Sequence, residues 1–201
     1  SLHKRIQGSY AAISLISGHG ILAFRDPFGI RPLVIGKRLS VKNKEEWMIA
    51  SESLVLENND YKIERDVKPG EAIFISNQGE FFSQQCADNP KLFPCSFEYV
   101  YLARPDSIMN GISVYKARLK MGDFLAETIK KTIKSGDVDV VMPIPDSSRP
   151  AAMQVARQLA IEYREGFFKN RYVGRTFIMP GQHKRKQSVR QKLNAMSTEF
   201  K

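Results

Sequence analysis

The sequence predicts an α+β region, dominated by sheet, followed by an α/β region. Residues 8–95 contain short apolar stretches rich in branched side chains and separated by Pro, Gly and Asn, which is typical of strands joined by turns. After about Pro94 the apolar residues recur with the helical period of about 3.6 instead of the strand period of two. We therefore expect two domains, residues 1–95 and 96–201, with the boundary where the period changes.

Six strands are expected in the first region, each bounded by residues that favour turns. Residues 26–29 and 68–70 place proline at the second position of a turn, and residues 77–79 suit a short hairpin. The expected strands cover residues 9–16, 20–24, 33–37, 47–50, 72–76 and 80–83.

The second region begins with a long amphipathic helix over residues 113–134. Its apolar residues fall on or near one face, namely Val114, Ala117, Met121, Leu125, Ile129 and Ile133. A short apolar strand over residues 139–144 and a second helix from about Pro150 follow, and Ala152, Val155, Ala156, Leu159 and Tyr163 are expected on the inner face of that helix. Helix, strand, loop and helix in this order predict an α/β unit with a parallel sheet.

The net charge of +10 is concentrated at one end of the sequence. Residues 167–201 contain nine Lys and Arg and one acid, a net charge of +8, which leaves +2 for the other residues. Such a segment suits a nucleic-acid-binding tail, a solvated helix face or a pocket for a polyanionic small molecule, and charge does not decide among them. No apolar run reaches the roughly 18 residues of a membrane-spanning helix, and we expect a cytoplasmic protein that contacts no membrane.

Two segments are candidates for ligand binding. Residues 145–148 (Pro-Asp-Ser-Ser) join a parallel strand to a helix N-terminus, where α/β folds bind phosphates, although N-capping is the more frequent role of such serines. Residues 169–193, here called the basic loop, combine cations with the apolar residues 177–179 and have weak periodicity. This combination is typical of a flexible lid, in which cations meet phosphate and apolar side chains exclude water.

Four strings of residues resemble the glutamine phosphoribosylpyrophosphate amidotransferases, in that family's order. They are FRDPFGIRPL (24–33), ASES (50–53), FEYVYLARPDS (97–107) and KNRYVGRTFIMPGQ (169–182), and the resemblance extends from about Gln7 to the end. It implies a glutaminase domain of the N-terminal-nucleophile hydrolase fold, then a type I phosphoribosyltransferase domain. The implied enzyme transfers ammonia from glutamine to phosphoribosylpyrophosphate (PRPP), giving phosphoribosylamine in the first committed step of purine synthesis.

The resemblance also implies roles for individual residues. PRPP contacts are expected at Asp146, Ser147, Ser148, Lys169, Arg171, Tyr172 and Arg175, with Ser147 contacting Mg²⁺. Tyr101, Phe177 and Ile178 resemble the lining of an ammonia channel. By contrast, we expect Arg25, Asp26 and Arg31 to organise a turn rather than to act in catalysis.

Several further expectations follow from the same resemblance. The family's N-terminal cysteine nucleophile and paired aspartates have no counterpart in this sequence, so no catalytic residue is assigned and the 201 residues alone are expected to be inactive. Cys95 stands near a cluster-ligand position of some members, but no iron–sulfur cluster is expected. The expected partners are glutamine, PRPP, purine nucleotide inhibitors and further copies of the chain.

Two non-enzymatic functions are the alternatives. One is a nucleotide-sensing regulator with a phosphoribosyltransferase-like domain, for which a helix-turn-helix segment would be expected, and none is found in the sequence. The other is a basic nucleic-acid-binding module, which tight and sequence-specific binding would reveal.

Overall fold

The structure is a computed structural model that describes residues 2–134, 136–174, 176 and 180–200. It divides into two compact units, Ser1–Val114 and Tyr115–Lys201. This division lies later than the expected domain boundary at residue 95, because hydrogen bonds tie the following residues to the first unit. The Ser107 hydroxyl donates to Glu52 Oε2 at 2.6 Å, and the Ile108 amide donates to Ser53 Oγ at 2.8 Å.

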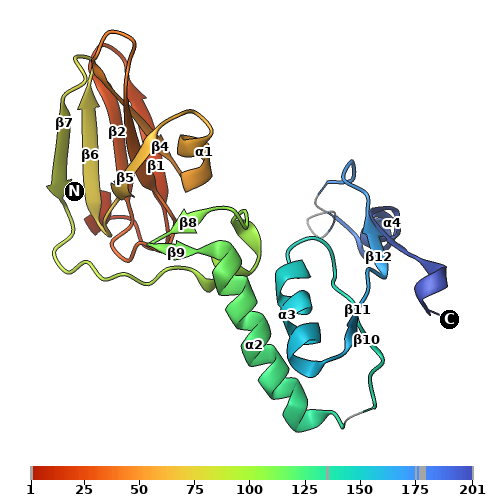
Figure 1. Cartoon of the computed structure of the whole chain (residues 1–201). Coiled ribbons are helices and arrows are strands. Elements are labelled where there is room, and N and C mark those ends of the chain that lie inside the picture. Colours follow the sequence, from red (N-terminus) through yellow and green to blue (C-terminus); the bar gives the residue numbers. More distant parts are fainter. Residues whose placement is uncertain (1, 135, 175, 177–179, 201) are drawn as a thin grey trace. The chain divides into compact units, whose positions relative to one another are not determined.

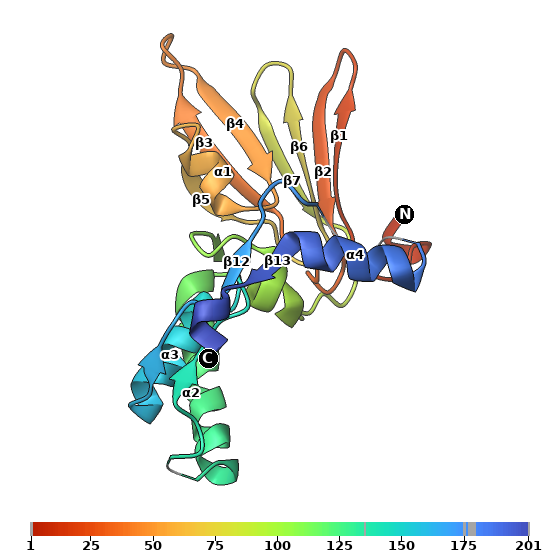
Figure 2. The same cartoon turned by 90° about the vertical axis from the view of Figure 1, so that its right-hand side faces the viewer.

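The first unit contains two antiparallel sheets (Figure 1). One has the strand order β1-β2-β6-β7, with bounds β1 Ala11–Ile16, β2 Gly20–Arg25, β6 Glu71–Ser76 and β7 Phe81–Gln85. The other has the order β4-β3-β5, with bounds β3 Val34–Leu39, β4 Glu45–Ala50 and β5 Lys62–Asp66. Figure 2 separates the two sheets most clearly.

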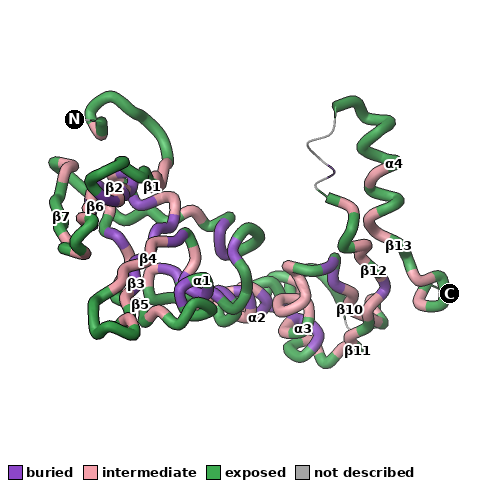
Figure 3. Tube along the Cα trace, turned by 90° about the horizontal axis from the view of Figure 1, so that it is seen from above, coloured by how far each residue is buried: buried purple, intermediate pink, exposed green. Residues whose placement is uncertain are grey.

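Two groups of buried apolar residues hold this unit together. Ala23 and Ile73 of the first sheet pack with Ile35 of the second, so one core lies between the sheets. The rings of Trp47 and Phe81 stack at 4.7 Å at its margin. A second core lies between β3, β4 and helix α1 (Ser53–Glu57), and its buried members are Val34, Ala50 and Leu56. Figure 3 shows the buried stretches gathered along these strands and α1.

The six expected strands are confirmed, with ends shifted by up to a few residues. Strand β5 and helix α1 were not predicted. β5 contains a single apolar residue, Ile63, and is held by pairing with β3 across a register shift at Ile35 and Gly36. Helix α1 has five residues, which is too short to show a helical period. A π-helical turn (Glu98–Leu102) and a small hairpin of β8 (Ile108–Met109) and β9 (Ile112–Ser113) complete the unit.

In the second unit, helices α2 (Val114–Thr132) and α3 (Arg149–Leu159) accompany a parallel pair of short strands, β10 (Val140–Val141) and β11 (Glu162–Tyr163). The predicted first helix and the parallel pairing are confirmed, although β10 is shorter than expected. Tyr163 was expected on α3 but lies in β11, because Ala160 adopts a left-handed conformation (φ 55°) that ends the helix.

The remaining elements are β12 (Phe167–Lys169), α4 (Gln182–Lys192), β13 (Leu193–Ala195) and a 3₁₀ turn (Ser197–Phe200). β12 and β13 pair antiparallel, with Lys169 opposite Leu193. Most of the basic loop therefore lies between two paired strands, and it contains a helix where no regular structure was expected. Gln, Lys and Arg favour helices, but α4 is polar all round and gives no apolar period to detect.

None of the helices in the described ranges combines the length and the apolar character that crossing a membrane requires.

Candidate functional site

The 145–148 loop follows the carboxyl end of β10 and leads into the N-terminus of α3. The peptide bond between Pro145 and Asp146 is cis. Ser148 occupies the N-cap position of α3 but makes no side-chain capping bond, and its hydroxyl instead donates to the Ile144 carbonyl at 2.5 Å. The N-capping alternative is therefore wrong for Ser148. The Ser147 hydroxyl has no hydrogen-bond partner among the described residues.

Asp146 lies between two cations that come from different elements. Lys169, the last residue of β12, places Nζ 2.7 Å from Asp146 Oδ2, and Arg149, the first residue of α3, places Nη1 3.0 Å from Oδ1. The pKa of the Asp146 carboxyl lies below its usual value, first because of the hydrogen bond from Lys169 and then because of the charges of Lys169, Arg149 and Arg171. Asp146 is therefore an ionised carboxylate at neutral pH.

Arg149 also contacts a second carboxylate, Glu165, in the connection between β11 and β12. Its Nε lies 3.0 Å from Glu165 Oε1, and Nη2 lies 3.4 Å from Oε2. The Tyr163 hydroxyl donates to the same Oε1 at 2.8 Å. Arg149, Glu165 and Tyr163 were not predicted as site residues. Arg149 and Glu165 are 16 positions apart in the sequence, and a contact at that separation produces no periodic pattern.

Two further residues predicted to bind PRPP lie in the turn after β12. Arg171 is exposed and close enough to Asp146 to lower its pKa, and the Tyr172 side chain is fully exposed. The Tyr172 amide donates to Asn170 Oδ1 at 3.0 Å, while the Asn170 amide donates to the Lys192 carbonyl at 2.7 Å. The turn is thus tied to the end of α4, at the base of the basic loop. Arg175, Phe177 and Ile178 lie outside the described residues.

The chain is similar to solved structures of enzymes of purine synthesis, among them the following two. The glutamine PRPP amidotransferase of B. subtilis, solved with ADP and GMP, is 37% identical with a TM-score of 0.77, and the match covers 97% of this chain and 40% of that one. A structure described as the allosteric regulatory enzyme of purine biosynthesis gives 36% identity and a TM-score of 0.77, over 97% of this chain and 39% of that one.

Curated relatives show higher identity over the whole chain. The amidophosphoribosyltransferase of Pseudomonas aeruginosa is 56% identical over 200 residues, that of Escherichia coli 55% over 199 residues and that of Saccharomyces cerevisiae 49% over 203 residues. The chain therefore belongs to the amidophosphoribosyltransferase family. No family model matches the sequence. The match covers 99–100% of this chain and 39–40% of those three amidophosphoribosyltransferases.

Tyr101, which the amidophosphoribosyltransferase resemblance assigns to an ammonia channel, lies in the π-helical turn of the first unit. Its side chain is 44% exposed, and its ring lies 5.4 Å from that of Phe97. The other two residues assigned to the channel, Phe177 and Ile178, lie outside the described residues, so the structure does not test this assignment.

Arg25 and Asp26, in the first of the four strings that resemble the family, organise the backbone around them. Arg25 is buried and donates to the carbonyls of Arg31, Val67 and Gly29, each at 2.7 Å. Asp26 accepts from the amides that follow it in the turn, including that of Ile30 at 3.1 Å. The structural role predicted for these residues is confirmed.

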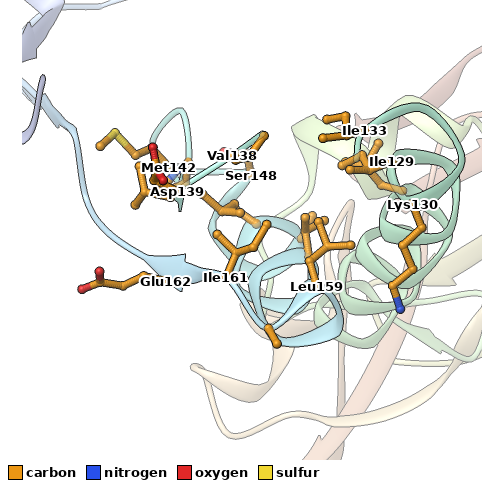
Figure 4. Close-up of a pocket in the computed structure, with 18 of the residues that line it drawn as sticks. Ile129, Lys130, Ile133, Val138, Asp139, Met142, Ser148, Leu159, Ile161 and Glu162 are labelled. Atoms are coloured by element: carbon orange, nitrogen blue, oxygen red, sulfur yellow. The ribbon is translucent and has the colours of Figure 1, made fainter. Parts of the chain in front are cut away.

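An apolar cavity of about 900 Å³ lies in the second unit, between α2, β10 and α3. Figure 4 shows aliphatic side chains around it, among them Ile129, Leu159 and Ile161. Ser148 lies at its margin, and the charged groups that line it, such as Lys130 and Glu162, do not converge on one point in this view. Ligand pockets usually contain a few convergent polar groups. We therefore interpret this cavity as an apolar surface available for packing rather than as a ligand-binding site.

Proposed function

We propose that this protein is an amidophosphoribosyltransferase, which releases ammonia from glutamine and transfers it to PRPP to give 5-phosphoribosylamine, glutamate and pyrophosphate. The observation that carries the proposal is the identity of 55–56% to two bacterial amidophosphoribosyltransferases over nearly the whole chain.

The proposal divides the work between two domains. The antiparallel sheets of residues 1–95 suit part of a glutaminase domain of the N-terminal-nucleophile hydrolase fold. The helix, parallel strands and loop of residues 96–201 suit part of a type I phosphoribosyltransferase domain. The order of the two regions in the sequence supports this division, because it is the order of the two domains in the family.

PRPP is proposed to bind over the 145–148 loop. The amide groups near the N-terminus of α3 suit a phosphate. We assign phosphate contacts to the Ser147 and Ser148 hydroxyls and to the cations Lys169, Arg171 and Arg175, and a ribose contact to Tyr172. Closing the basic loop would surround the anion with cations and reduce the access of water.

The oxygen donors of this site fit a magnesium ion only in part. Ser147 and Asp146 offer hard oxygen ligands of the type Mg²⁺ prefers, but the described residues contain no group of three or more His, Cys, Asp or Glu placed to hold a metal. Phosphate oxygens of the substrate would therefore complete the shell, as is common for Mg²⁺. When bound, the ion would neutralise the departing pyrophosphate, with Ser147 as its proposed contact in this chain.

Ammonia is proposed to travel past Tyr101, Phe177 and Ile178. An apolar passage suits this task, because ammonia must stay unprotonated to attack and few proton donors line such a path. Regulation by purine nucleotides is proposed because the B. subtilis relative was solved with ADP and GMP. A cytoplasmic homo-oligomer without an iron–sulfur cluster completes the proposal.

The direct test measures phosphoribosylamine formation by the complete gene product, with PRPP, Mg²⁺ and either glutamine or ammonium salt. We expect activity with both nitrogen sources. The 201 residues alone are expected to release no glutamate from glutamine. Absence of activity in the folded complete protein with both sources would refute the proposal.

Limited trypsin digestion tests the assignment of the basic loop independently of turnover. Helix α4 contains no buried residue and carries several Lys and Arg, so cleavage should begin between Lys169 and Lys192. PRPP with Mg²⁺ should slow that cleavage, because closing the loop hides its backbone. First cleavage elsewhere, unaffected by PRPP, would contradict the assignment.

A further inference from the structure

Arg149 occupies the first position of α3, where a positive charge is unfavourable unless acidic groups compensate it. The N-terminus of a helix carries partial positive charge, and the first turn of α3 contains no acidic residue. The Arg149 side chain nevertheless stays 42% exposed and contacts two carboxylates, Asp146 and Glu165. These two partners, rather than the helix, account for a cation at this position.

All three guanidinium nitrogens of Arg149 are used within the second unit. Nη1 donates to Asp146 at 3.0 Å, whereas Nε and Nη2 donate to the two oxygens of Glu165 at 3.0 and 3.4 Å. Tyr163 in turn orients Glu165 through its hydroxyl. Three of its five N–H donors are used in this way, and a planar fork shared by two carboxylates suits the role of orienting them.

The two cations that hold Asp146 differ in how easily they leave it. Lys169 is a point charge on a flexible stem at the start of the basic loop, whereas Arg149 presents a planar fork that two carboxylates hold. A polyphosphate entering the site would attract the Lys169 ammonium away from Asp146 Oδ2, whereas Arg149 would keep its contact with Oδ1.

We propose that Arg149 is a positioning residue: supported by Glu165, it holds the Asp146 carboxylate and the 145–148 loop in the binding geometry while Lys169 moves to the phosphates. This inference rests on the proposed function, because it takes PRPP as the ligand. The same contacts join the loop to the connection that leads into β12, the strand from which the basic loop starts. Arg149 thereby couples the loop that receives the phosphate to the base of the segment that closes over it.

The test uses the complete gene product and measures PRPP binding calorimetrically in Mg²⁺, together with ammonia-dependent rates. Arg149→Met should weaken PRPP binding roughly tenfold with kcat within about twofold, because the loss lies in ground-state positioning. Arg149→Lys should restore part of the affinity, since a lysine at this position reaches one carboxylate but not both. Glu165→Gln should weaken binding in the same direction by a smaller factor.

Arg164→Met is the matched control, because it removes the same charge from the connection between β11 and β12. Arg164 pairs with Glu162 at 3.0 Å and with Glu199 at 3.6 Å, and its side chain is exposed to a similar degree. The PRPP affinity of Arg164→Met should stay within about twofold of the wild type, because the exposed ion pairs of Arg164 include neither Arg149 nor the 145–148 loop. Equal weakening by Arg149→Met and Arg164→Met would indicate a general charge effect and overturn the inference.

The remaining outcomes separate this inference from the proposed function. Unchanged PRPP binding in Arg149→Met, with normal binding by the wild type, overturns the inference alone. If Arg149→Met fails to fold, Glu165→Gln decides, and unchanged binding in that variant overturns it. A folded wild type that does not bind PRPP refutes the proposed function and the inference together.

Discussion

The ammonium of Lys169 lies 2.7 Å from the carboxylate of Asp146, so the first residue of the basic loop contacts the 145–148 loop. Two segments separated by 23 positions in the sequence thus share one ion pair. A polyanion that attracts Lys169 would break this ion pair and so change the contacts of both segments. We therefore expect the ion pair to rearrange when the basic loop closes over a ligand.

Replacement of Lys169 by methionine should weaken PRPP binding by one to two powers of ten. The variant loses a charge-assisted contact worth about 1.5–3 kcal/mol, and it leaves Asp146 with one cation fewer to offset repulsion of the phosphates. Calorimetric titration with PRPP and Mg²⁺ measures the change. Lys131→Met, which removes the same charge from the exposed last turn of α2, should bind as the wild type does. Equal affinities for the Lys169 variant and the wild type would contradict the contact's role.

Replacement of Arg25 by methionine should lower the free energy of unfolding of the first unit by about 3–5 kcal/mol. It leaves three carbonyls without their donor in a buried region, and each unsatisfied group costs about 1–3 kcal/mol before relaxation. Urea unfolding followed by the fluorescence of Trp47, the single tryptophan, reports on this unit.

Arg38→Met serves as the control for Arg25→Met. Arg38 forms an exposed pair with Glu46 at 2.9 Å, so its loss should cost at most about 1 kcal/mol. A cost for Arg25→Met no larger than that of the control would show that water replaces the lost donors.

The sequence predicted most of the first unit because its strands carry their own apolar pattern. It did not predict β5, whose position depends on pairing with β3 rather than on its own residues. Helix α4 was also not predicted. Its residues favour helices, but they form no apolar face, so the sequence shows no helical period there. The 145–148 loop was found through its place between strand and helix, but Glu165 was not, because only folding brings it to Arg149.

Replacement of Gly122 by alanine should destabilise the second unit although alanine favours helices. A Cβ at this position would lie 2.6 Å from the Ala151 carbonyl oxygen, a backbone atom of α3 that cannot move aside by itself. The overlap would separate α2 from α3, which are also joined by the hydrogen bond from Gln154 to Asp123 at 2.7 Å. A gain of about 1 kcal/mol in helix propensity is outweighed by overpacking, and we expect a net loss of about 1–3 kcal/mol.

Hydrogen exchange of the α2 and α3 amides measures this loss as faster exchange in Gly122→Ala. Gly174→Ala is the control, because a Cβ there meets nothing within 4 Å and the backbone needs no positive φ. Its exchange in α2 and α3 should match the wild type. Equal or slower exchange in Gly122→Ala would show that the two helices adjust without cost.

The pH dependence of Tyr163 provides a test of the network behind Arg149. Burial, followed by the hydrogen bond to Glu165 and its negative charge, raises the pKa of Tyr163 to about 12. Since the folded pKa lies above the ordinary value of about 10, the neutral phenol is favoured in the folded protein. Its contribution to stability is complete below pH 10 and is lost as the pH rises through about 12.

Absorbance titration at alkaline pH should therefore show a late tyrosine transition near pH 12 that Tyr163→Phe removes, separate from that of Tyr10, whose pKa is also raised by burial and by the charge of Asp26. Glu165→Gln should move that transition toward lower pH, because the negative charge that opposes ionisation is gone while the burial remains. Tyr172→Phe is the matched control, since the Tyr172 side chain is fully exposed and its loss should leave the late transition in place. A late transition that persists unchanged in Tyr163→Phe would assign it to another tyrosine and would remove Tyr163 from the contacts that orient Glu165.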